Sequence, residues 1–333
     1  MITCTGGPAM ARPTTKQRPQ AARSAARQAR HKPGRRLPWP WLVLGMALVP
    51  AAIGVMFALG HSSGDGGKPI AILRTSDFHA LAFSPDNPNV VFFGHHNGLM
   101  RSDDGGRTWR PVIDRPNFDA MSLTVNPRDP RQIFLAGHDV FLVSTDGGAS
   151  WQPVKHNLPG TDIHGFALNP DEPSRLYAFV VGYGLFTSAD GGRTWQKLST
   201  QLPMDVMALA SAGGSPETIY AGSMGAGVLK STDGGLTWAP SNAGLRSWGV
   251  MALAVNPVAR QVVYAGAEDG LYRSNDAGAS WRKLSFPGRN VIAIAVSPSD
   301  PQIVLAIEGV RRGEGRLYRS TDGGATWDGG RGR

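Results

Sequence analysis

The sequence predicts an all-β fold: a six-bladed β-propeller of four-stranded blades, closed by an N-terminal strand and preceded by one transmembrane helix. Three observations lead to it. A motif recurs about every 43 residues, two strand-like runs precede each copy, and one long uncharged segment lies near the N-terminus. The chain has 333 residues, of which 41% are hydrophobic, so it can bury a sizeable core. Glycine and proline account for 68 residues, which fits a protein rich in tight turns.

The uncharged segment covers residues 39–60, WPWLVLGMALVPAAIGVMFALG. As a helix it would span about 30 Å, the thickness of a bilayer core. Residues 1–38 hold nine Lys/Arg and no Asp/Glu, which places the N-terminus in the cytoplasm. We therefore expect a basic cytoplasmic tail (1–38), a transmembrane signal anchor (39–60), a linker (61–68) and an extracytoplasmic propeller (69–333) in the cell membrane. A cleaved signal peptide is the alternative, because Ala58-Leu59-Gly60 resembles a cleavage site.

The net charge of +9 comes entirely from the tail. Outside residues 1–38 the chain has 25 basic and 25 acidic residues, which removes the electrostatic case for a nucleic-acid partner. The single cysteine, Cys4, lies in the tail. An intrachain disulfide and a cysteine-based zinc site are therefore excluded.

The recurring motif is an octet that begins with serine and ends with tryptophan, as in SDDGGRTW. Its copies occupy residues 102–109, 144–151, 188–195, 231–238, 274–281 and 320–327. Each is expected to form a hairpin turn, with glycine at positive φ, aspartate bonded to backbone N–H groups and tryptophan packed back on the strands. The structural residues are Asp104, Trp109, Asp146, Trp151, Asp190, Trp195, Asp233, Trp238, Asp276, Trp281, Asp322 and Trp327.

Strand signals surround each octet. An apolar run that ends in a proline turn comes first, as in ALAFSPDNP (80–88), and a β-rich run such as VVFFG (90–94) follows. A third strand leads into the octet and a fourth follows its tryptophan. Four short strands in about 43 residues are typical of a propeller blade.

The two ends of the repeat array indicate how the ring closes. Only DGGRGR follows Trp327, so the sixth blade lacks its outer strand. Residues 69–74, PIAILR, lie where the outer strand would be in other repeats. We expect this N-terminal strand to complete the sixth blade and leave no long edge exposed.

The octets resemble the Asp box, Ser-x-Asp-x-Gly-x-x-Trp, of sialidase-like and sortilin-like propellers. The resemblance implies that the boxes are structural and lie on the face away from any active site. Residues 77–81 (DFHAL), 94–99 (GHHNGL) and 137–139 (GHD) are similar to bacterial Asp-box proteins catalogued as glycosyl hydrolases. That label comes from the fold and carries little weight for function. Photosystem assembly factors also use Asp-box propellers, but their basic patch is not evident here.

Register assigns residues to the opposite, functional face. The starts of the inner strands and the loops between second and third strands share this face. Aligned inner strands place two series of residues there: Asp77, Asp119, Asp162, Asp205, Gly249 and Asn290, and, two positions on, His79, Met121, His164, Met207, Met251 and Ile292. Residues two apart on a strand point the same way. The loops add His95, His96, His138, Asp139, Tyr183, Met224, Glu268, Asp269, Glu308, Arg311 and Arg312.

Two interpretations of this face stay open. In one, the aspartates cap loops between blades and the methionines plug the channel. In the other, the face binds a ligand, a metal or a partner protein. The ligand-binding candidates are His79, His95, His96, His138, His164, Asp77, Asp119 and Asp162. His79, His95 and His164 are the candidate metal ligands, for zinc with His/Asp donors or for copper with His/Met donors.

The function predicted from these observations is a membrane-anchored binding module. The alternative is a glycoside hydrolase acting at the same face, for which the candidate catalytic residues are Asp77, Asp119, Asp162 and Asp205. Sialidase chemistry, as the resemblance implies it, is disfavoured because Arg74 is followed by Thr75 and Ser76 in place of the family's Arg-Ile-Pro stretch. The sequence also lacks a phosphate-binding loop and a nucleophile elbow.

Overall fold

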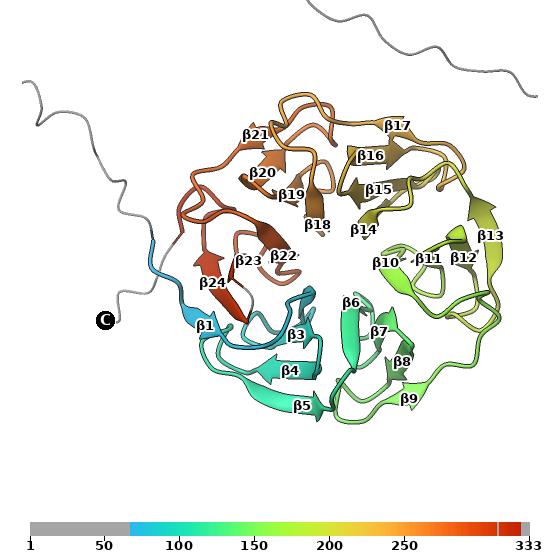
Figure 1. Ribbon diagram of the computed structural model, residues 1–333, viewed down its shortest axis with the longest axis horizontal. Helices are drawn as coiled ribbons and strands as arrows, with labels where there is room; N and C mark the ends of the chain where they lie inside the picture. The colour runs from blue at the N-terminus through green and yellow to red at the C-terminus, as the bar shows by residue number, and fades with distance from the viewer. Residues whose placement is uncertain (1–66, 312, 328–333) are drawn as a thin grey trace, which may run out of the picture. The chain divides into compact units, whose positions relative to one another are not determined.

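The computed structural model describes residues 67–311 and 313–327. These residues form an all-β propeller of six antiparallel four-stranded sheets, which confirms the predicted blade number and blade size. Figure 1 shows the six blades arranged around a central axis. The predicted tail and anchor, and most of the linker, lie outside the described residues. Within the two described ranges, no helix has the length and apolar character to cross a membrane.

Three blades come from the first half of the propeller, each with its strands ordered from the axis outward. They are β2 (Ala80–Phe83), β3 (Val91–His95), β4 (Gly98–Ser102) and β5 (Arg110–Asp114); β6 (Asp119–Val125), β7 (Ile133–His138), β8 (Val140–Ser144) and β9 (Gln152–Pro153); and β10 (Ile163–Leu168), β11 (Leu176–Val180), β12 (Gly184–Ser188) and β13 (Gln196–Ser199).

The other three blades follow the same order. They are β14 (Val206–Gly213), β15 (Thr218–Ser223), β16 (Gly227–Ser231) and β17 (Ala239–Pro240); β18 (Val250–Val255), β19 (Val263–Ala267), β20 (Gly270–Ser274) and β21 (Arg282–Lys283); and β22 (Val291–Val296), β23 (Val304–Arg311), β24 (Glu314–Ser320) and β1 (Ala71–Leu73). Neighbouring inner strands contact one another around the whole ring, including β22 with β2.

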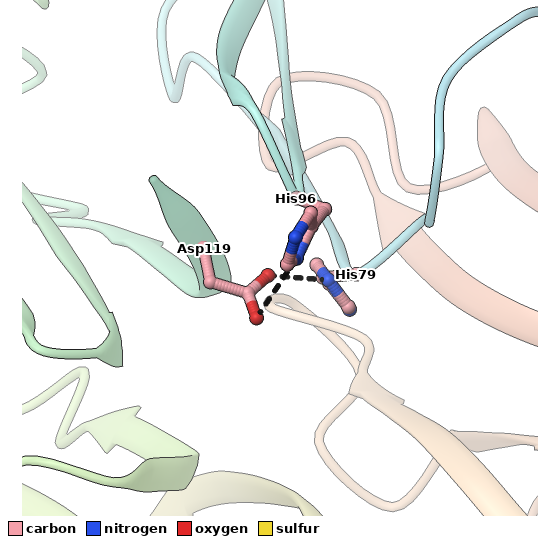
Figure 2. A group of neighbouring side chains, drawn as sticks. All are labelled: His79, His96 and Asp119. Carbon is pink, nitrogen blue, oxygen red and sulfur yellow. Dashed lines mark ion pairs between the residues drawn. The ribbon is translucent and has the colours of Figure 1, made fainter. Parts of the chain in front are cut away.

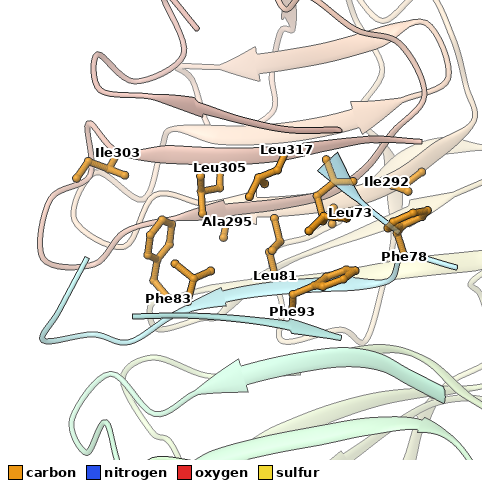
Figure 3. Close-up of a cluster of buried hydrophobic side chains, with 13 residues drawn as sticks. Leu73, Phe78, Leu81, Phe83, Phe93, Ile292, Ala295, Ile303, Leu305 and Leu317 are labelled. Carbon is orange, nitrogen blue, oxygen red and sulfur yellow. The ribbon is translucent and has the colours of Figure 1, made fainter. Parts of the chain in front are cut away.

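The sixth blade combines strands from both ends of the described chain. Strand β1 pairs antiparallel with β24, with Ala71 opposite Leu317 and Leu73 opposite Gly315. Leu73 is buried in a core cluster that joins the first blade to the sixth (Figure 3). In that cluster Phe93 belongs to the first blade, Phe78 lies just before that blade's first strand, and Leu317 belongs to the sixth blade. The chain's first described strand is thus packed against its last.

The same hydrogen bonds between the serine, the aspartate and the turn hold all six Asp boxes, whereas the tryptophan N–H bonds the second glycine's carbonyl in the first four. In the fourth box, Ser231 Oγ donates to Asp233 Oδ1 at 2.7 Å, and the Thr237 hydroxyl donates to Asp233 Oδ2 at 2.6 Å. The Thr237 N–H donates to Asp233 Oδ1 at 2.9 Å, and Trp238 Nε1 donates to the Gly235 carbonyl at 3.0 Å. The aspartate therefore closes the turn, as the sequence predicted.

Each Asp box also packs against the preceding blade. A Cβ added to the second glycine of a box would press on a core side chain of the preceding blade, as Gly148 would on Phe92 at 2.9 Å. That same glycine has a φ of +86°, a conformation that L side chains rarely adopt. Arg101 of the first blade donates to the Gly147 carbonyl, also in the second box. Glycine is thus required there both by the turn and by the blade interface.

β-Bulges mark the starts of the inner strands. The register of β10, β14, β18 and β22 skips one residue near the strand start, and the skipped residues are His164, Met207, Met251 and Ile292. Strand β6 shifts between Asp119 and Ser122. A bulge re-aims the side chain of its extra residue. The four skipped residues all line the cavity described next.

Candidate functional site

A cavity of about 800 Å³ lies at one end of the propeller axis. Its lining includes Asp77, His79, His96, Asp119, Met121, His138, His164, Met207, Met251, Asn290, Ile292 and Arg311. The antiparallel strands run from this end to the Asp boxes, since β4 begins beside the His95 turn and ends at Ser102 of the first box. The cavity and the boxes therefore occupy opposite ends of the blades. We call the cavity the channel mouth.

The channel narrows below the mouth. Met121, Met207 and Met251 line both the mouth and a waist of about 90 Å³. A further cavity of about 240 Å³ opens at the other end, among the turn prolines such as Pro85 and Pro127. Thioether side chains adapt to irregular spaces. The methionines thus form an apolar floor under the polar groups of the mouth.

Asp119 is the centre of the polar groups. It begins β6 and is only 5% exposed. Three imidazole nitrogens surround its carboxylate: His79 Nε2 at 2.7 Å from Oδ1, and His138 Nδ1 and His96 Nδ1 at 2.8 and 3.3 Å from Oδ2. Figure 2 shows His79 and His96 converging on Asp119. A carboxylate this buried needs such partners, because desolvation of an unpaired charge is costly.

The pair of His79 and Asp119 has an unusual geometry. His79 Nε2 and Asp119 Oδ1 are close, yet their angles do not meet those of a hydrogen bond, and neither buried atom has another hydrogen-bond partner within the described ranges. A buried polar atom without a partner calls for an explanation, of which an ion is one. His79, His96 and Asp119 each offer one ligand atom within 4.8 Å of the others.

A second group adjoins the first through His138. His138 Nε2 lies 2.9 Å from Asp162 Oδ1 and 2.9 Å from His164 Nε2, and His164 Nε2 lies 3.0 Å from the same Asp162 oxygen. Asp162 Oδ1 is buried and has no hydrogen-bond partner of acceptable geometry within the described ranges. Three potential metal-ligand atoms therefore converge within about 3 Å of one another.

Strand pairing explains why these side chains meet. His138, the last residue of β7, is the cross-strand partner of Asp119 and forms an isolated bridge with Asp162 of the next blade. Cross-strand partners have neighbouring side chains. A Cβ at Gly137 would overlap the backbone oxygen of Asp119, so a glycine there allows the end of β7 to approach β6 closely.

The electrostatics of the two groups differ. Burial alone would raise the pKa of Asp119, but the imidazoles of His138 and His79 outweigh it, and the pKa lies below its usual value. The contact with Asp119 raises the pKa of His138. Burial lowers the pKa of His164, which favours its neutral form, the form that binds metals. The pKa values of the two histidines thus shift in opposite directions, up for His138 and down for His164.

Not every predicted site residue lines the mouth: His95, Asp162 and Asp205 do not, whereas Asp77 does. His95 does not line the mouth; its Nδ1 lies 2.9 Å from Thr75 Oγ1 and accepts from the Asn97 N–H, and its ring stacks on Phe93. Asp205 accepts a hydrogen bond from Ser223 Oγ at 2.6 Å. Asp77 lines the mouth and accepts from the Phe78 N–H at 3.0 Å.

The acidic residues of the later blades form local pairs. Asp269 accepts from Lys283 Nζ and Tyr272 Oη, at 2.8 and 2.7 Å, and Glu308 lies 3.7 Å from Arg316. These acidic residues are thus paired with neighbours in their own blades. The two His/Asp groups lie in the first three blades.

Sequence reasoning named His138 and His96 as ligand-binding candidates but not as metal ligands. The structure places both in groups of three potential metal-ligand atoms. Their position in the repeat could have identified them, because the GHH and GHD stretches lie at the ends of equivalent strands, β3 and β7. Their histidines therefore reach the same end of the blades.

Comparisons with known proteins agree with the fold. A Sortilin-Vps10 family model, described as sortilin, neurotensin receptor 3, matches residues 226–331, a stretch from the fourth blade to the sixth. None of the curated proteins compared with the chain matches its sequence. The chain is an Asp-box β-propeller that resembles sortilin-like proteins in its later blades.

Solved structures with the same fold include two kinds of protein. The GH74 xyloglucanase from Xanthomonas campestris aligns with a TM-score of 0.54 and 21% identity over 78% of this chain, and this chain spans 46% of the length of the xyloglucanase. YCF48 from Cyanidioschyzon merolae aligns with a TM-score of 0.50 and 20% identity, covering 79% of this chain and 88% of its own. At these identities the likeness establishes the fold alone.

Proposed function

We propose that this protein is a binding module that holds a transition-metal ion at the channel mouth. The observation that carries the proposal is the convergence of four imidazoles and two carboxylates, from His79, His96, His138, His164, Asp119 and Asp162, in two adjoining groups. Imidazole with carboxylate is a donor set that suits zinc and other late transition metals. The buried oxygens without hydrogen-bond partners support an ion over a purely structural network.

The test is metal retention by the purified full-length chain. After chelation, the protein is incubated with Zn²⁺ or Cu²⁺, dialysed and measured by mass spectrometry. We expect near-stoichiometric retention by the wild type and its loss in a His79→Ala/His164→Ala variant, which removes one potential ligand from each group. His156→Ala is the matched control, because His156 lies outside the mouth lining and bonds the Leu158 N–H. Retention of neither ion by the wild type, or equal retention by the double variant, would refute the proposal.

A glycoside hydrolase at the same face is the alternative function. Asp77 and Asp119 both line the mouth, and the xyloglucanase shares the fold. A two-carboxylate mechanism needs one carboxyl that is protonated before reaction. Asp119 fits that role poorly, because its neighbouring imidazoles favour the ionised form. Release of reducing sugar from polysaccharides, xyloglucan included, by the wild type but not by Asp77→Asn would establish the alternative.

We further propose that the module is tethered to the cell membrane by residues 39–60, with the propeller outside the cytoplasm. The uncharged segment and the basic residues before it support this orientation. We also propose that the N-terminal strand closes the ring, for which the pairing of β1 with β24 is the support. A metal-binding mouth would then lie on the extracytoplasmic side of the membrane.

A further inference from the structure

The two groups at the mouth differ in how their ligand atoms are arranged. In the group of His138, Asp162 and His164, three atoms are separated by 2.9, 2.9 and 3.0 Å. In the group around Asp119, His79 approaches one carboxylate oxygen and His96 approaches the other. The separations in the former group are therefore all close to 3 Å, whereas the two histidines of the latter group approach different oxygens of one carboxylate.

Those separations indicate a coordination geometry. With metal–ligand bonds of about 2.1 Å, adjacent ligands of an octahedral ion lie roughly 3.0 Å apart, whereas those of a tetrahedral ion lie roughly 3.4 Å apart. The observed separations match the octahedral value. Two histidines and one carboxylate on one face of a six-coordinate ion leave three positions open.

In this arrangement Asp119 is not a metal ligand but contacts one of the ligands, His138. Its Oδ2 lies 2.8 Å from His138 Nδ1, the ring nitrogen that does not face Asp162 and His164. Metal-binding histidines commonly donate their other ring N–H to a carboxylate, which fixes the tautomer and the orientation of the ring. Asp119 is only 5% exposed and is held by β6, so it can orient His138 rigidly.

We propose that His138, Asp162 and His164 bind one divalent transition-metal ion as three facial ligands of a six-coordinate site. The inference rests on the metal-binding function proposed above and specifies where the ion lies and how it is coordinated. Asp119 is a positioning residue that orients His138. The three remaining coordination positions take water or a small ligand with oxygen or nitrogen donors, which the cavity of about 800 Å³ admits.

The experiment loads the full-length chain with Co²⁺, whose visible absorption distinguishes six-coordinate from four-coordinate sites by its intensity. We expect one equivalent per chain with the weak bands of a six-coordinate ion. His164→Ala should lower the affinity at least about 100-fold, and His164→Gln repeats the test if that variant folds poorly. His156→Ala is the matched control, a histidine outside the mouth lining, and should keep one equivalent with affinity within about threefold. His79→Ala removes an imidazole of the other group and so reports which of the two groups holds the ion.

Asp119 is tested by two substitutions. Asp119→Ala should weaken Co²⁺ binding about 10- to 100-fold and change the absorption bands, whereas Asp119→Asn, which keeps an acceptor oxygen, should restore part of both. Intense four-coordinate bands, two equivalents per chain, or loss in His79→Ala with retention in His164→Ala would overturn the inference while leaving metal binding intact. Unchanged Co²⁺ bands in Asp119→Ala would overturn its positioning role. Absence of any bound ion would overturn the proposed function as well.

Discussion

At the scale of single residues, aspartates serve two different purposes in this molecule. In the boxes, aspartates such as Asp233 accept hydrogen bonds from the turn that they close. At the mouth, Asp119 is buried, and imidazole nitrogens from three strands or turns lie 2.7 to 3.3 Å from its carboxylate oxygens. The first arrangement is complete within eight residues of chain. The second requires three segments of chain that are far apart in the sequence to meet. The mouth carboxylate therefore does more than close a local turn.

The Asp boxes predict an acid-sensitive stability. The Thr237 hydroxyl, with other turn donors, lowers the pKa of Asp233 from its usual 3.8 to about 2, and the same holds for the aspartates of three other boxes, Asp104, Asp146 and Asp276. A depressed pKa means that the unfolded chain binds protons first. The stabilisation is therefore present above about pH 4 and is lost as the pH falls through about 2.

Two variants of one box test this with urea unfolding at pH 7, 4 and 2.5. Asp233→Asn should be less stable at pH 7, and its stability should fall less than that of the wild type between pH 4 and 2.5. Thr237→Ala keeps the carboxylate but removes a donor at 2.6 Å, so its pH dependence should be intermediate. Equal pH dependence in all three proteins would contradict the assignment.

The residue scale also shows where sequence reasoning ends. Register correctly brings Asp77, His79 and Asp119 to one cavity, because a strand period of two fixes which residues share a side. It does not distinguish His95 from His96. His95 continues β3 and stacks on Phe93, whereas His96 belongs to the turn and reaches Asp119. The direction of a turn residue depends on turn geometry, which two adjacent histidines do not encode.

At the scale of elements, the strands are predictable and the bulges are not. Proline turns and octets delimit each blade so clearly that all six sheets follow from the repeat. The bulges at the starts of inner strands turn His164 and three apolar residues into the mouth. A bulge adds one residue without any compositional mark, so it is found from pairing alone. The contact between His138 and His164 could therefore not be predicted from the sequence, and the structure reveals it.

Strand β1 gives an element-scale prediction about closure. Leu73 is buried in the core between the first and sixth blades, whereas its neighbour Ile72 is 52% exposed. Leu73→Ala should lower the free energy of unfolding by about 2 to 5 kcal/mol, since it removes buried methyl groups and leaves a cavity. Ile72→Ala shortens an exposed side chain of the same strand and should change the free energy of unfolding by less than about 0.5 kcal/mol. Urea unfolding measures both; equal effects would mean that β1 does not seal the ring.

At the scale of the whole molecule, charge divides the chain into two parts. The net charge of +9 belongs to residues 1–38, and the remainder is balanced. The propeller itself therefore has no long-range field to attract nucleic acid, and its specificity must arise from local groups. The His/Asp groups at the mouth are such local groups, because burial and mutual contacts give them properties that net charge does not describe.

The proposed orientation in the membrane can be tested through the only cysteine. Cys4 lies in the basic tail, so a thiol reagent that cannot cross membranes should leave the protein unlabelled in intact cells and label it after lysis. A Cys4→Ser/Ser63→Cys variant moves the single thiol past the uncharged segment and should be labelled in both conditions. Labelling of Cys4 in intact cells would reverse the orientation. Recovery of a soluble chain that lacks Cys4 would instead indicate cleavage near Gly60, because the thiol would be lost with the removed segment. The two orientations differ in labelling and cleavage differs in size, so one gel of the fractionated samples distinguishes a tethered mouth from a released one.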